Sequence, residues 1–251
     1  MITFINSSKT MSFDDKGHKI KPSKPIFEDE ANYLANKILD LGYEGMQEMM
    51  GVSNKLAELN FQRYIDFVNT NIKSPAIYAY KGDVYSGLKA ELLSKEDLDF
   101  GQKHIRIISG IYGILKPLDE IKPYRMEMGY KFINNKKLDV YWNEILKKEL
   151  KKEMKATGEI IINLSSKEYS AAINSAKNYS KWIDIEFLDS LRGEYKFITL
   201  YGKRARGMMA RYIMNNKIDN PEDLKEFDYE GYMYSEERST LDKFVFIRDE
   251  F

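Results

Sequence analysis

Residues 105–129 restrict the fold of this chain more than any other segment, because an apolar run there is interrupted by two glycines and two prolines. Gly110 and Gly113 flank an Ile-Tyr pair, and Pro117 and Pro123 flank a short charged stretch. Glycine and proline interrupt regular helices, and charged side chains are unusual in a buried strand. We therefore expect an irregular segment at the centre of the functional surface.

The sequence Ser-Gly-Ile-Tyr-Gly at residues 109–113 resembles the turn of a helix–hairpin–helix module. In such a turn, glycines present backbone N–H groups to a DNA phosphate without an intervening Cβ. Residues 95–108 would supply the first helix, and Pro117 would begin the second. A buried strand that turns at a glycine gives the same spacing, and spacing alone favours that alternative. The candidate DNA contacts in this turn are Ser109, Gly110, Tyr112 and Gly113.

The rest of the chain alternates irregularly between helical and extended patterns. Ser94 and Asp97 form the pattern of a capping box. Helices are expected at residues 28–41, 54–67, 84–93, 95–104, 139–155 and 203–216, and strands at 2–5, 76–80, 159–164, 182–188, 195–201, 229–234 and 244–248. The order of these elements predicts one mixed α/β domain over residues 1–251, with a central mixed sheet, flanking helices and a helix–hairpin–helix-like element.

Composition excludes several classes of site. The 39 basic and 39 acidic residues leave no net charge, so affinity for nucleic acid must come from local clustering. The absence of cysteine excludes disulfides, thiolate metal sites and a cysteine nucleophile. With only His18 and His104 present, we expect no histidine-based metal site and no cofactor. The lack of a signal-peptide pattern and of a long apolar run predicts a cytoplasmic protein that binds no membrane.

The expected helix at 203–216 is basic without any acidic residue. At 100° per residue its apolar side chains fall on one arc, and the basic ones fall on the other side. Gly207 and Ala210 lie among the basic residues, where small side chains would let a phosphate approach the backbone. A solvated basic face is the alternative, although such faces usually include acids. The candidate phosphate contacts are Lys203, Arg204, Arg206 and Arg211.

Polar residues also follow several expected strands, and strand ends in α/β folds commonly gather in one cleft. A desolvated lysine there would be a nucleophile, a carboxylate a general acid or base, and an arginine a clamp for an anion. Each of these residues is also explained as a helix cap or a surface charge. The catalytic candidates, which would share a cleft with Lys203, are Lys9, Lys81, Asp83, Arg125 and Glu127.

Motifs along nearly the whole chain resemble those of the YaaA-like peroxide stress proteins. They lie at residues 7–10, 55–63, 80–88, 106–119, 123–129, 163–169, 203–209 and 231–232. Two positions depart from the family pattern. The turn before Lys9 lacks the proline of the family's Ser-Pro-Ala-Lys-Thr, and Lys116 replaces an arginine, which keeps the charge but loses the bidentate fork.

The resemblance implies a cytoplasmic α/β protein that protects against hydrogen peroxide. The family is associated with limiting intracellular iron and oxidative DNA damage, and with DNA binding through a positively charged cleft and a helix–hairpin–helix element. Our leading hypothesis is therefore a protein that binds double-stranded or structured DNA by shape, without an obligatory protein partner. The alternative is a glycosylase- or lyase-like enzyme that acts on a nucleobase or nucleotide through a lysine. Direct iron binding by Asp83, Asp119 and Glu127 is a weaker third hypothesis.

Overall fold

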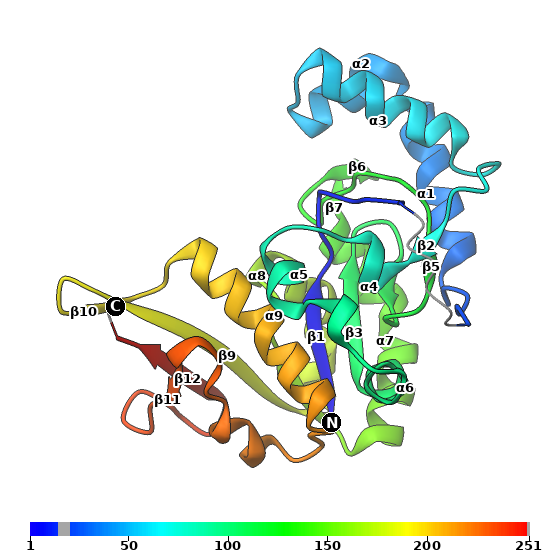
Figure 1. Cartoon of the computed structure of the whole chain (residues 1–251). Coiled ribbons are helices and arrows are strands. Elements are labelled where there is room, and N and C mark those ends of the chain that lie inside the picture. The colour runs from blue at the N-terminus through cyan, green and yellow to red at the C-terminus, as the bar shows by residue number, and fades with distance from the viewer. Residues whose placement is uncertain (15–20, 250–251) are drawn as a thin grey trace.

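A central sheet of eight strands organises the computed structural model, which describes residues 1–14 and 21–249 (Figure 1). The strand order is β11-β12-β9-β8-β1-β3-β4, and β10 pairs with β9. The central pairs are parallel, whereas β4, β10 and β11 pair antiparallel with their neighbours. The strands are β1 (Ile2–Asn6), β3 (Ile105–Ser109), β4 (Gly113–Leu115), β8 (Ile160–Asn163), β9 (Lys181–Leu191), β10 (Glu194–Lys196), β11 (Met233–Tyr234) and β12 (Lys243–Arg248).

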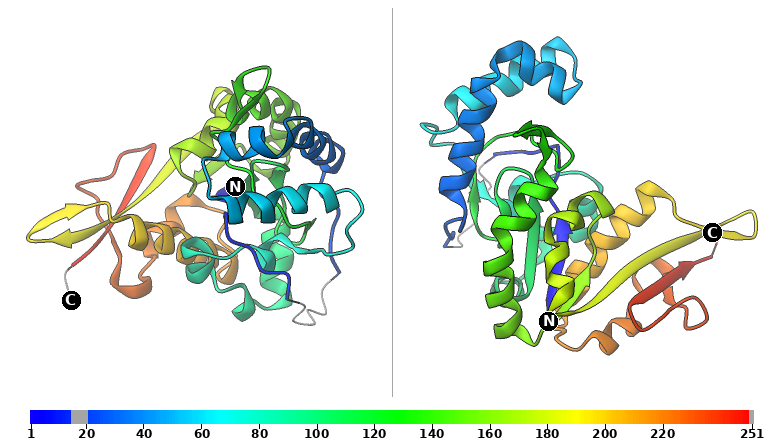
Figure 2. Two further views of the ribbon diagram at one scale, coloured as in Figure 1. Left: turned by 90° about the horizontal axis from the view of Figure 1, so that it is seen from above. Right: turned by 180° about the vertical axis from the view of Figure 1, so that it is seen from behind.

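Helices cover both faces of this sheet, which explains why β1 and β3 consist almost entirely of buried residues. On one face, α9 (Thr199–Asn215) packs against β1 and β9, with α5 (Asp83–Leu88) and α6 (Lys95–His104) beside it. On the other face lies α7 (Leu138–Thr157), packed against η2 (Ala171–Asn178) (Figures 1 and 2). The predicted mixed α/β fold with a central mixed sheet is confirmed.

Two parts of the chain extend away from the sheet. The helices α2 and α3 project beyond one end of it, and the long strand β9 carries β10 outward on another side (Figure 1). The remaining elements are α1 (Glu28–Asp40), α2 (Gly42–Met50), α3 (Asn54–Asp66), β2 (Ser74–Pro75), α4 (Ala76–Ala79), η1 (Ala90–Leu92), β5 (Glu120–Ile121), β6 (Lys131–Ile133), β7 (Lys136–Lys137), α8 (Lys167–Ser170), η3 (Pro221–Glu226) and η4 (Tyr229–Gly231). No helix within the described residues is long and apolar enough to cross a membrane.

The strand expected at residues 76–80 is wrong, because residues 76–79 form the short helix α4. The backbone N–H groups of Ala76 and Ile77, which no helical carbonyl can satisfy, donate to the carbonyl oxygens of Asp119 and Pro117 at 2.9 Å. A distant segment therefore satisfies the start of this helix. The strand expected at 195–201 is also too long, since β10 ends at Lys196 and α9 begins at Thr199.

The helix–hairpin–helix prediction is wrong in its local structure. The helix α6 ends at His104, and the chain then enters β3, which pairs antiparallel with β4 through the register Ser109↔Gly113. Residues 109–113 are therefore the turn of a β-hairpin, and all five are buried. The alternative that spacing alone favoured, a buried strand turning at glycine, is the one observed.

Candidate functional site

A cluster of polar side chains around Glu127 forms where the turn at the carboxyl end of β1 meets the loop between β5 and β6. We call Lys9, Arg125, Glu127 and Tyr130 the strand-end cluster. The Glu127 side chain is only 17% exposed and forms an ion pair with Lys9, which lies in the turn after β1. Its Oε1 atom also accepts hydrogen bonds from Arg125 Nη2 at 3.1 Å and from the Tyr130 hydroxyl at 3.0 Å. Three of the five catalytic candidates thus meet at one point.

The charges of the cluster favour an ionised Glu127. Burial raises the pKa of Glu127, but hydrogen bonds from Lys9 and Tyr130 and the positive charges of Lys9 and Arg125 outweigh it, and the pKa falls below its ordinary value. Burial and then the charge of Glu127 raise the pKa of Tyr130 to about 12. At neutral pH, Glu127 is thus an acceptor of protons or an anchor for a cation, and it has no proton to donate.

Of the other two catalytic candidates, Lys81 lies close to this cluster through a hydrogen bond of its backbone. The Lys81 N–H donates to the carbonyl oxygen of Thr10 at 2.9 Å, which places Lys81 beside the turn that carries Lys9. The Lys81 ammonium, however, donates to the carbonyl oxygen of Tyr78 at 2.9 Å. Asp83 is the first residue of α5, where a negative charge is favourable, and the structure gives it no contact with Glu127.

Three buried hydroxyl groups form a hydrogen-bonded network next to the strand-end cluster. The Tyr124 hydroxyl is hydrogen-bonded to the Tyr80 hydroxyl and, at 2.8 Å, to Ser109 Oγ. Ser109 Oγ also accepts a hydrogen bond from the backbone N–H of Tyr112 at 3.1 Å. Burial raises the pKa of Tyr124, so its hydroxyl keeps its proton. Ser109 and Tyr112, predicted to contact DNA, therefore hold the hairpin in the core.

The two glycines of the hairpin face protein atoms. A Cβ on Gly110 would lie 2.6 Å from the carbonyl oxygen of Met126, and one on Gly113 would lie 2.6 Å from the ring of Trp142. The Trp142 indole N–H also donates to the carbonyl oxygen of Gly110 at 2.7 Å. The glycines are required by this close packing, and the expected close approach of a phosphate is blocked.

A basic cleft lies between α9, β9 and the end of β8, with a volume of about 840 Å³. Lys203 and Arg206 of α9 contribute to it, and the Arg206 guanidinium lies 5.5 Å from the centre of the Phe197 ring. Burial lowers the pKa of Arg206, which the carboxylates of Glu186 and Asp184 partly offset, and an arginine still remains charged at neutral pH. The charged residues that line the basic cleft are Lys167, Lys177, Asp184, Glu186, Lys203, Arg206 and Lys243.

The basic cleft adjoins the strand-end cluster but does not merge with it. Asn6, the last residue of β1, donates to Ser166 Oγ at 3.2 Å and accepts from the Ser166 N–H at 3.0 Å. Ser166 lines the basic cleft, whereas the turn that follows Asn6 carries Lys9. The expected single site that holds both Lys9 and Lys203 is therefore two neighbouring sites at the same edge of the sheet.

The basic residues of α9 do not share one face. Arg204 forms an ion pair with Glu230, and the Arg211 guanidinium lies 5.1 Å from the centre of the Tyr229 ring. Both therefore face η4, on the side away from the basic cleft. Gly207 and Ala210 are buried, and Gly207 packs against α5, so neither provides the expected approach for a phosphate.

Several polar residues of these sites were missed in the sequence. Tyr130 was not a candidate, and Glu168 was noted only within the 163–169 motif, although its Oε1 accepts a hydrogen bond from the Gly129 N–H at 3.0 Å. Asp184 and Glu186 alternate with buried apolar residues along β9, and this period of two was a usable signal for a polar strand face. No local sequence pattern predicts that Lys177 of η2 and Lys243 of β12 line the cleft.

The described residues hold no group of three or more histidine, cysteine, aspartate or glutamate side chains that could bind a metal ion. Asp119, a candidate iron ligand, is 1% exposed and accepts hydrogen bonds from the Ser23 hydroxyl at 2.6 Å and the Lys116 N–H at 2.8 Å. It is therefore used to hold the 116–119 turn. His18 lies outside the described residues.

A family model described as peroxide stress protein YaaA matches residues 1–238. The match includes the strand-end cluster and all lining residues of the basic cleft except Lys243. It covers well over half of the chain and agrees with the motifs that run through it, from the Lys9 turn to the residues before β12. The chain therefore belongs to the peroxide stress protein YaaA family and has a role in peroxide stress.

Proposed function

We propose that this protein binds double-stranded or structured DNA during peroxide stress, and that the basic cleft receives the phosphate backbone. The observation that carries this proposal is the concentration of five basic side chains in one cleft of a chain without net charge. Contacts of this kind are independent of sequence and respond to the shape of the DNA. Of the candidate DNA contacts, Lys203 and Arg206 are the two that lie in this cleft.

The five basic side chains of the cleft outnumber its two acids, Asp184 and Glu186, which leaves its surface positive. Asp184 accepts hydrogen bonds from Asn163 at 2.7 Å and from the Trp182 indole at 2.9 Å. Glu186 forms an ion pair with Lys243 at 3.3 Å. Lys203 is exposed and adaptable, whereas Arg206 is held against Phe197 and is ready to contact a phosphate.

A titration of the full-length chain with short duplexes of unrelated sequence, at two salt concentrations, tests this proposal. We expect binding to all duplexes and a steep loss of affinity with salt. The variants Lys203→Gln and Arg206→Gln should each weaken binding and reduce the slope of log K against log salt by about one. Arg211→Gln removes a charge from the same helix on its other side and should leave the slope unchanged. The absence of binding at low salt, or unchanged slopes in both cleft variants, would contradict the proposal.

A second candidate function rests on the strand-end cluster, where Lys9, Arg125 and Glu127 converge. In this alternative the protein is an enzyme that acts on a nucleobase or nucleotide, with Lys9 as the nucleophile and Glu127 as a general base toward the substrate. Reduction with borohydride in the presence of a duplex with an abasic site should then trap the chain on DNA. Lys9→Gln should abolish the trapping, and no trapping with any lesion would remove the lyase version.

The family resemblance further suggests that the protein lowers intracellular iron during peroxide stress. This effect needs no iron site on the chain. Chelatable iron in peroxide-treated cells with and without the protein is the relevant measurement, and equal values would contradict this part of the proposal.

A further inference from the structure

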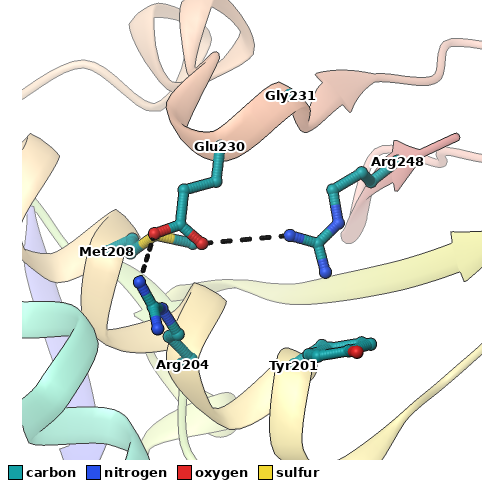
Figure 3. A pocket seen from close by; sticks show the side chains of 6 residues that line it. All are labelled: Tyr201, Arg204, Met208, Glu230, Gly231 and Arg248. Carbon is teal, nitrogen blue, oxygen red and sulfur yellow. Dashed lines mark hydrogen bonds and ion pairs between the residues drawn. The ribbon is translucent and has the colours of Figure 1, made fainter. Parts of the chain in front are cut away.

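A separate pocket lies on the side of α9 away from the basic cleft, with a volume of about 570 Å³ (Figure 3). Such a volume is typical of sites for small molecules, which occupy roughly 300–1,000 Å³. Three of its side chains come from successive turns of α9, and the others come from η4 and β12. We call it the two-arginine pocket, and its lining residues are Tyr201, Arg204, Met208, Glu230, Gly231 and Arg248.

Arg248 is held in one position at the wall of this pocket. Its Nε donates to Asp189 Oδ1 at 2.7 Å, and its Nη2 lies 2.6 Å from the same oxygen. The guanidinium also lies against two aromatic rings, 4.9 Å from the centre of Tyr201 and 4.5 Å from that of Tyr232. The remaining nitrogen, Nη1, faces the carboxylate of Glu230 (Figure 3). A guanidinium that is fixed by its pair with Asp189 therefore turns its remaining nitrogen toward the pocket.

Arg204 provides the second positive charge, and Glu230 lies between the two. Arg204 Nη2 forms a direct ion pair with Glu230 Oε1, whereas Arg248 Nη1 is 3.9 Å from Glu230 Oε2, which is too long for a hydrogen bond. Arg204 Nε is buried and has no hydrogen-bond partner among the described residues. Glu230 is thus shared between the two guanidinium groups, and it leaves Arg204 Nε without a partner in the described part of the chain.

The backbone that carries Glu230 is in an unfavourable conformation. Glu230 has φ 54° and ψ 31°, in the left-handed region that side chains other than glycine rarely adopt, and Gly231 follows with φ 81°. The Tyr229 ring, which packs on Tyr212 and Phe227, holds η4 in place, whereas no residue of η4 is buried. The Glu230 side chain is 38% exposed, so it can leave the pocket without opening the core.

We propose that the two-arginine pocket binds a phosphate monoester, and that Glu230 occupies the place of this anion in the free protein. A dianionic phosphate has three terminal oxygens and twice the charge of a carboxylate, so it can contact both guanidinium groups at once. Tyr201 and Met208 give the pocket an apolar wall, and its volume leaves room for a sugar and a ring attached to the phosphate. This site is independent of the basic cleft.

A terminal phosphate of this kind occurs on a free nucleotide and on a phosphorylated DNA end. Calorimetric titration of the full chain with adenosine 5′-monophosphate, and with a short duplex that carries either a 5′-phosphate or a 5′-hydroxyl, distinguishes the two sources. We expect the mononucleotide to bind, or the phosphorylated duplex to bind more tightly than the hydroxyl form. If neither is observed in the wild-type protein or in Glu230→Gln, the proposal is wrong.

Variants of the pocket test the displacement of Glu230. Glu230→Gln keeps the size of the side chain and removes the competing charge, so affinity for the phosphate should rise roughly fivefold. Arg204→Gln should lower it by at least about fivefold, and Arg204→Lys, which retains the charge, should restore part of the loss. Arg238→Gln removes an exposed charge outside the pocket and should have no effect. Unchanged affinity in both Glu230→Gln and Arg204→Gln would overturn the proposal.

Discussion

Gly207 of α9 packs directly on Val84 of α5, and a Cβ on Gly207 would lie only 1.7 Å from the Val84 carbonyl oxygen. Gly87 makes the reciprocal contact, because a Cβ there would lie 2.0 Å from the carbonyl oxygen of Arg204. The two helices therefore cross with their backbones in contact. This contact fixes the position and the rotation of α9, the helix that lies between the basic cleft and the two-arginine pocket.

Gly207→Ala should destabilise the protein, because the added methyl group has no space unless α5 and α9 separate. We expect the free energy of unfolding to fall by about 3 kcal/mol. Urea denaturation measures this change. Gly45→Ala in α2 is the control, since its Cβ would meet only Leu41 Cβ at 3.2 Å, and it should change the free energy by about 1 kcal/mol or less. Equal stability of Gly207→Ala and the wild type would contradict the crossing.

Gly113→Ala tests the role of the buried hairpin. Gly113 has φ 67°, and an added Cβ would also meet the Trp142 ring, so the free energy of unfolding should fall by about 3 kcal/mol. Gly158→Ala isolates the backbone contribution, because Gly158 has φ 88° but no atom within 4 Å of the added Cβ, and it should cost only about 1 kcal/mol. A Gly113→Ala variant with wild-type stability but weakened DNA binding would instead support a hairpin that contacts phosphate.

Glu153→Ala should be strongly destabilising. The Arg106 side chain on β3 is 6% exposed, and its Nε and Nη2 atoms lie 2.8–3.0 Å from the carboxylate of Glu153 on α7. Removing the carboxylate leaves a buried positive charge unpaired, which costs about 3–5 kcal/mol. Glu149→Ala breaks the neighbouring exposed pair with Lys152 and should cost less than about 1 kcal/mol. Chemical denaturation of both variants gives the comparison, and similar losses would contradict the burial of the pair.

Glu127→Gln should lower stability in a way that depends on pH. Because the pKa of Glu127 is lower in the folded protein than its ordinary value of 4.5, the ionised group stabilises the fold above about pH 4.5. This contribution is lost as the pH falls through the folded pKa. The difference in unfolding free energy between the wild type and Glu127→Gln should be about 1 kcal/mol at pH 7 and should shrink below pH 4.5. A difference that stays constant from pH 7 to pH 3 would contradict this role.

Local sequence patterns predicted correctly those elements whose structure depends on neighbouring residues of the same segment. Ser94 and Asp97 form the predicted capping box at the start of α6. The convergence of Lys9, Arg125 and Glu127 was expected from a shared cleft at the strand ends, but only Lys9 follows a strand of the central sheet, and Arg125 and Glu127 reach it from the loop between β5 and β6. The fold class followed from the alternation of helical and extended patterns.

Contacts between distant segments account for the errors. The turn at Gly110 and Gly113 is buried because Trp142, about thirty residues later, closes over it, and the Gly-x-x-Gly spacing carries no information about that ring. Helical periodicity placed the basic residues of α9 away from its apolar arc. It did not indicate that Glu230 of η4 would pair with Arg204, or that β9 would line a cleft together with Arg206. The positions of η4 and β9 relative to α9 depend on the whole fold.

The fixed rotation of α9 has a consequence for how sequences of this kind can vary in length. An insertion of one residue between Tyr201 and Arg206 would turn the following residues by about 100°. It would remove Arg206 from the basic cleft and break the register of Gly207 against α5. Insertions and deletions in related chains should therefore be confined to the segments that flank the helix, before Thr199 and after Asn216. A natural relative with a gap inside α9 would have to carry compensating changes in both α5 and η4.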